Sequence, residues 1–108
     1  MDSVTLFAFQ DDTIKISIEA YFEGNTLIID GYDIGKKVKD YWGDSDYEYK
    51  LTIPPMSVEF LFGHFGIVYS PSVLLQTLAA KFNTNTCFSD IRNLLDAHKQ
   101  PCEGFSWR

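Results

Sequence analysis

The sequence predicts an α+β fold, an antiparallel sheet of about four to five strands with three to four helices packed on one face. The chain has 108 residues, which suits one hydrophobic core, so we expect residues 1–108 to form a single domain. Apolar residues alternate with polar ones in the first half, whereas in the second half they recur every three to four positions. The turns between the early segments are short, as in antiparallel neighbours.

The alternating segments predict the strands. Between residues 14 and 22 every second residue is apolar, which is typical of a strand with one wet face. The segments 4–9 and 26–29 flank it across polar turns and predict two more strands. Residues 46–53 alternate again, and residues 102–107 predict a short final strand.

A short helix is predicted between the third and fourth strands. Asp33 is expected to be its N-cap, and apolar residues over 34–42 form one stripe at helical spacing. Gly43 is a natural residue to end it.

Three more helices are predicted after residue 53. The first begins at Pro54-Pro55 and ends at Gly66, and the second begins at Ser70-Pro71. Ser89 is expected to cap the last helix, which Gln100-Pro101 ends.

The charge of the chain is uneven. The formal net charge is −6, and residues 1–53 hold eleven acids and five bases, whereas residues 54–108 hold four of each. A protein with this balance is poorly suited to nucleic acid, because each phosphate contact needs a cation. It suits a basic partner, which long-range attraction brings in faster.

No catalytic residue is predicted. His64 and His98 are the only histidines, and both fall on apolar helical stripes, where a partly buried imidazole with a satisfied hydrogen bond is the usual role. The sequence lacks the patterns of a nucleophile elbow, a zinc protease or a phosphate loop. We therefore expect a protein that is not an enzyme and uses no cofactor.

No metal site is predicted either. The acidic run that starts at Asp44 fails as an EF-hand loop, because Tyr49 stands at the sixth position and Pro55 at the twelfth. Cys87 and Cys102 lie in no zinc-binding pattern.

The chain is expected to be cytoplasmic, with free thiols. Its start, Met1-Asp2-Ser3, has no basic or apolar signal region. The longest apolar stretch, residues 58–69, is interrupted and too short to span a bilayer, so no membrane partner is expected.

The most unusual segment is residues 40–49, which combines four acids with four large aromatic residues. Periodicity places the aromatic residues Trp42, Tyr47 and Tyr49 on core faces. The acids have no place in a core, so they are either solvated surface or a strip that binds cationic groups of a partner. These candidate partner-binding residues are Asp40, Asp44, Asp46 and Glu48.

Three stretches carry a resemblance to a known class of proteins. They are residues 30–35 (DGYDIG), residues 42–49 (WGDSDYEY) and residues 105–107 (FSW). In overall pattern, over residues 26–107, the chain resembles the immunity proteins of bacterial contact-dependent growth inhibition and other polymorphic toxin systems. The resemblance implies a cytoplasmic protein that binds a cognate toxin domain, often a basic nuclease, and blocks its active site or substrate groove.

The leading hypothesis is therefore an immunity or inhibitor protein. The alternative is a small interaction or regulatory module with no toxin partner, which dimerises through an exposed sheet edge. A small enzyme would instead need a pocket that holds His64 or His98 beside a carboxylate or Cys102. The sequence leaves the oligomeric state open.

Overall fold

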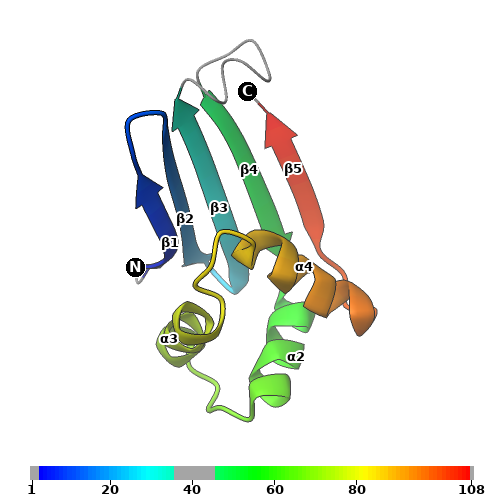
Figure 1. The fold of residues 1–108 in the computed structure, drawn as a ribbon. Coiled ribbons are helices and arrows are strands. Elements are labelled where there is room, and N and C mark those ends of the chain that lie inside the picture. Colours follow the sequence, from blue (N-terminus) through cyan, green and yellow to red (C-terminus); the bar gives the residue numbers. More distant parts are fainter. Residues whose placement is uncertain (1–2, 36–45, 108) are drawn as a thin grey trace.

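A computed structural model describes residues 3–35 and 46–107, with Asp46 and Trp107 described by their backbone only. Five strands and three helices occupy these residues (Figure 1). The strands are β1 (Ser3–Gln10), β2 (Ile14–Glu23), β3 (Thr26–Gly35), β4 (Asp46–Ile53) and β5 (Glu103–Trp107). The helices are α2 (Pro55–Phe65), α3 (Pro71–Lys81) and α4 (Cys87–Ala97).

The strands form one antiparallel sheet in the order β1-β2-β3-β4-β5. The first four follow one another along the chain, whereas β5 returns after the three helices to pair with β4 (Figure 1). The register of β1 against β2 shifts between Thr5 and Phe7, and Leu6, the residue between them, is buried in the core.

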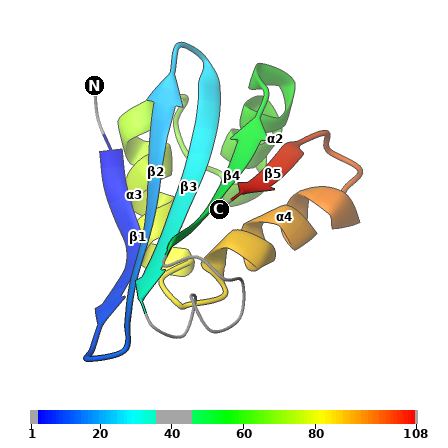
Figure 2. The ribbon, with the colours of Figure 1, turned by 90° about the horizontal axis from the view of Figure 1, so that it is seen from above.

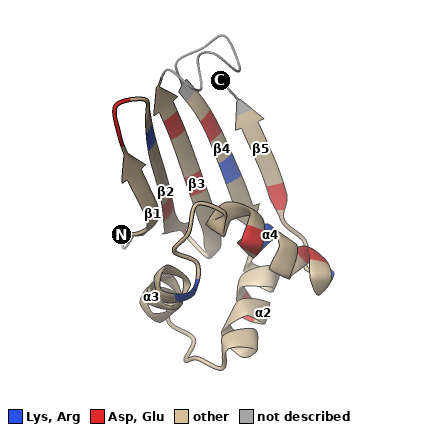
Figure 3. Ribbon diagram, viewed as in Figure 1, with Lys and Arg blue, Asp and Glu red and all other residues tan. Residues whose placement is uncertain are grey.

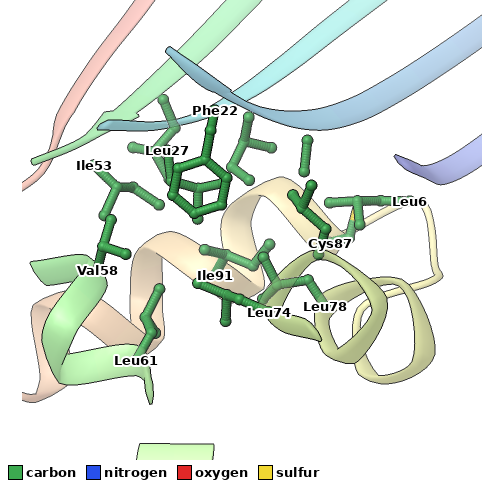
Figure 4. Close-up of a cluster of buried hydrophobic side chains, with 14 of the residues drawn as sticks. Leu6, Phe22, Leu27, Ile53, Val58, Leu61, Leu74, Leu78, Cys87 and Ile91 are labelled. Atoms are coloured by element: carbon green, nitrogen blue, oxygen red, sulfur yellow. The ribbon is translucent and has the colours of Figure 1, made fainter. Parts of the chain in front are cut away.

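The three helices lie on one side of the sheet (Figure 2). Side chains from β2, β3 and β4 point into the helix layer, where α2, α3 and α4 each contribute apolar residues (Figure 4). One hydrophobic cluster therefore joins the first half of the chain to the second. None of the described helices is long and apolar enough to cross a membrane.

The predicted α+β fold with an antiparallel sheet is confirmed, with five strands and three described helices on one face. The prediction that Asp33 caps a helix is wrong, because β3 continues to Gly35 and Asp33 pairs with Ile16 and Tyr47. Residues 36–43 of the predicted helix lie outside the described residues.

The missing side chain at Gly31 makes room for the ring of Tyr49. A Cβ atom at Gly31 would collide with the ring of Tyr49, which lies over this glycine from the neighbouring strand. The Tyr49 hydroxyl then donates a hydrogen bond to Asp33 Oδ1 at 2.9 Å. Burial, and next the Asp33 carboxylate, raise the pKa of Tyr49, so this hydroxyl keeps its proton and remains a donor.

The predicted signals mark both ends of α2 and the start of α3. α2 ends at Gly66 in the left-handed conformation (φ 64°), and the Ser70 hydroxyl accepts a hydrogen bond from Val73 N at the start of α3, as predicted. The predicted cap Ser89 instead lies inside α4, which begins two residues earlier. There the Thr86 hydroxyl donates to Asp90 at 2.9 Å.

The two cysteines are not bonded to each other. Cys87 is buried in the core and Cys102 is half-buried. Burial raises the pKa of both thiols, which favours the protonated form of each.

Candidate functional site on the helix-free face of the sheet

The pleat of the sheet separates core residues from residues on the opposite face. On β2, Ile18 and Ala20 are buried against the helices, so Lys15, Ser17 and Glu19 lie on the other side. The same alternation holds at the end of β4, whereas on β3 Ile28 is buried together with its neighbours Leu27 and Ile29. No helix in the described part of the chain covers this second face.

A shallow hollow of about 420 Å³ lies on the helix-free side. We call its lining the acidic sheet face, and it consists of Lys15, Ser17, Glu19, Asp30, Tyr32, Ile34 and Glu48. This set contains three carboxylates from three adjacent strands and one ammonium group, that of Lys15. Acidic bands on β2, β3 and β4 are visible in Figure 3.

The strand register brings two of the carboxylates side by side. Glu19 on β2 lies directly opposite Asp30 on β3, a like-charge pair that disfavours the sheet. Asp30 in turn lies opposite Lys50 on β4, and Glu48 lies opposite Tyr32. Glu19 is exposed, whereas Asp30 and Glu48 are half-buried, so water and incoming groups reach Glu19 most easily.

The pKa of Tyr21 reflects the negative charge of this region. Its hydroxyl donates a hydrogen bond to Asp30 Oδ2 at 3.4 Å. Burial raises the pKa of Tyr21, and the negative charges of Asp30, Glu23 and Glu19 raise it further, because each disfavours a phenolate nearby. The same charges favour a cation placed over the strands.

The structure places the predicted partner-binding residues unevenly. Asp40 and Asp44 lie outside the described residues. Asp46 begins β4, where its backbone pairs with Ile34, and Glu48 lies on the acidic sheet face.

Sequence reasoning missed Glu19 and Asp30 as members of this site. Alternation over residues 14–22 placed Glu19 on the polar side of its strand, but no pattern linked it to residues 46–48. Asp30 was not predicted to lie on the sheet, because the predicted third strand ended at Ile29. Only the pairing of β3 with both neighbours brings these carboxylates together with Glu48.

The lining of the acidic sheet face holds no histidine or cysteine. The expectation that the histidines are partly buried is wrong, since His64 and His98 are both exposed, on the helix side of the molecule. Within residues 3–35 and 46–107, no three His, Cys, Asp or Glu side chains gather in an arrangement that could hold a metal ion.

The acidic sheet face combines negative charge with apolar area. Carboxylates on a wet face attract lysine and arginine side chains, and Tyr32 and Ile34 add apolar area beside them. Comparison with known protein families, with curated proteins and with solved structures finds no match to this chain.

Proposed function

We propose that the protein is a non-enzymatic immunity or inhibitor protein, which binds a basic toxin domain through the acidic sheet face and covers the toxin's cationic surface. The observation that carries this proposal is the set of three carboxylates, Glu19, Asp30 and Glu48, on three adjacent strands of a face that no described helix covers. The resemblance in overall pattern to toxin-immunity proteins is the reason why we propose a toxin domain as the partner.

The mechanism is electrostatic and steric. A nuclease needs exposed lysines and arginines to hold phosphates, and the same groups pair with carboxylates. Carboxylates on a rigid sheet speed the encounter, and the docked sheet then excludes the substrate. Neither step needs a catalytic group on this chain.

Charge reversal at two exposed or half-exposed positions tests the proposal. The double variant Glu19→Lys, Glu48→Lys, mixed with the product of the adjacent gene, is expected to associate about ten- to a hundredfold more slowly than wild type at low salt. Stopped-flow binding measures this rate, and growth rescue of toxin-exposed cells measures protection. We expect protection to fall with the rate.

The matched control is the double variant Glu59→Lys, Asp96→Lys, which reverses two exposed carboxylates on α2 and α4, on the helix side of the sheet. It is expected to change the association rate by less than the variant Glu19→Lys, Glu48→Lys, because its charges lie farther from the docked partner. Equal rates and equal protection for wild type and the variant Glu19→Lys, Glu48→Lys would exclude the acidic sheet face as the docking surface.

A second candidate function rests on the edge of the sheet. β1 is an edge strand of eight residues, and Phe9 at its end is 45% exposed. An edge of this kind can pair with a second copy, as in a regulatory module that dimerises. A dimer seen by light scattering, with no binding to the toxin, would favour this alternative.

A further inference from the structure

We propose that His64 and His98 together form a binding site for a borderline divalent transition metal, represented here by Zn²⁺. The two residues are 34 positions apart in the sequence, on α2 and at the C-cap of α4. The fold brings their rings to a centroid separation of 5.2 Å at an interplanar angle of 63°. This site shares no residue with the acidic sheet face and does not depend on the proposed function.

The separation of the rings suits a shared metal ion. Zinc binds imidazole nitrogen at about 2.0–2.1 Å and prefers tetrahedral coordination, which places the centroids of two ligand rings roughly 5 Å apart. The centroids of the His64 and His98 rings lie 5.2 Å apart, which matches this separation. The two rings can therefore keep their separation when one nitrogen of each turns toward the ion.

The tautomer of His98 is already the one a metal ligand needs. Its Nδ1 lies 3.0 Å from the carbonyl oxygen of Leu94. A carbonyl oxygen only accepts hydrogen bonds, so Nδ1 carries the proton and Nε2 keeps its lone pair. Metal-binding histidines almost always make this second hydrogen bond, which fixes the ring and makes the free nitrogen more basic.

Aromatic neighbours hold both rings in place. Phe60 lies one helical turn before His64 and stacks on its ring at 5.4 Å, and it also contacts the His98 ring at 5.0 Å. Phe65 meets the His64 ring edge-on at 5.1 Å. Rings that are ordered before binding lose less conformational freedom when the ion arrives.

The coordination sphere of the ion stays open. Both histidines are exposed, so a hydrated ion can reach them. No third His, Cys, Asp or Glu joins the pair among the residues that the structure describes. Two imidazoles leave two of the four tetrahedral positions to water, one more than at zinc sites with three protein ligands.

Titration of the full chain with Zn²⁺ alone, followed by calorimetry, tests the site. We expect saturable binding, and we expect His64→Gln and His98→Gln each to lower the affinity by at least the ten- to hundredfold typical of lost outer-shell partners. Mg²⁺ is expected to show no binding that depends on these histidines, because it prefers oxygen ligands. In NMR spectra of the imidazole nitrogens, Zn²⁺ should shift the His98 Nε2 signal while Nδ1 stays protonated.

Cys102→Ser is the matched control, since Cys102 is a half-buried thiol that could bind zinc elsewhere on the chain. This variant should keep the wild-type affinity. Thermal unfolding without metal checks that each variant folds, which we expect because both imidazoles are exposed. Absence of binding, equal affinity in the two histidine variants and wild type, or loss of binding in Cys102→Ser would each overturn the proposal.

Discussion

The Asp33 side chain lies where burial disfavours its negative charge. It lies on the helix side of the sheet, half-buried, and accepts the hydrogen bond from Tyr49. Burial raises the pKa of Asp33, and the Tyr49 hydrogen bond lowers it by less. The folded state therefore binds a proton more readily at Asp33 than the unfolded chain does.

Replacing Asp33 by asparagine tests this cost. A raised folded pKa adds stability below the unfolded pKa, and that stability is lost as the pH rises through the folded value. Asparagine keeps an acceptor oxygen for Tyr49 and has no charge to desolvate. We therefore expect the stability of Asp33→Asn relative to wild type to grow as the pH rises above the ordinary Asp pKa of about 3.9, measured by urea unfolding at each pH.

The variant Tyr49→Phe provides the internal control for that series. Without the Tyr49 hydroxyl, the influence that lowers the Asp33 pKa is gone, so the pH-dependent gain from Asp33→Asn should be larger in this background. A gain that is constant with pH, or a loss that grows with pH, would contradict the account.

At the scale of the element, the packing of β3 against β4 depends on Gly31, because the Tyr49 ring lies over it. Replacing Gly31 by alanine would push a methyl group into the Tyr49 ring. We expect Gly31→Ala to lower the free energy of unfolding by about 1–3 kcal/mol, the usual cost of overpacking, as measured by urea unfolding. Loss of protection at the amide groups that pair β3 with β4 should accompany it in hydrogen exchange.

Gly63→Ala is the control for Gly31→Ala. Gly63 lies inside α2, and a Cβ atom there would meet nothing within 4 Å. Alanine is a better helix former than glycine, so this variant should gain about 0.5–1 kcal/mol. If both substitutions had the same effect, contact with Tyr49 would not be the reason for glycine at position 31.

The elements differ in how far the sequence predicts them. α2 and α3 have local start and stop signals, Pro55 and Gly66 for one and Ser70 for the other, and the structure keeps them. The end of β3 has no such signal. Asp33 is a good helix cap in isolation, but pairing with β2 and β4 outweighs that preference.

At the scale of the whole molecule, the acidic sheet face contains a repulsion between two adjacent strands. Glu19 and Asp30 face each other across adjacent strands. We expect Glu19→Lys to raise the free energy of unfolding by about 0.2–1 kcal/mol in low-salt urea unfolding, because it replaces a like-charge pair with an opposite pair. The same change should weaken binding to a basic partner.

The salt dependence and a control variant distinguish repulsion between Glu19 and Asp30 from other causes of a stability change. The gain from Glu19→Lys should shrink as salt screens the pair, at about 1 M ionic strength. Glu59→Lys changes the net charge equally but lies on α2, so it should gain less. Destabilisation by Glu19→Lys, or a gain independent of salt, would show that repulsion across the strands is not the cause.

The sequence by itself determined the α+β class, most strands, the two well-marked helices and the excess of acid in the first half. These follow from periodicity, turns and caps, which act between residues close in the chain. The tertiary structure decided that β3 continues to Gly35, that Glu19 and Asp30 join Glu48, and that His64 meets His98. Each of these depends on strand register or helix packing, which brings together residues that no local pattern connects.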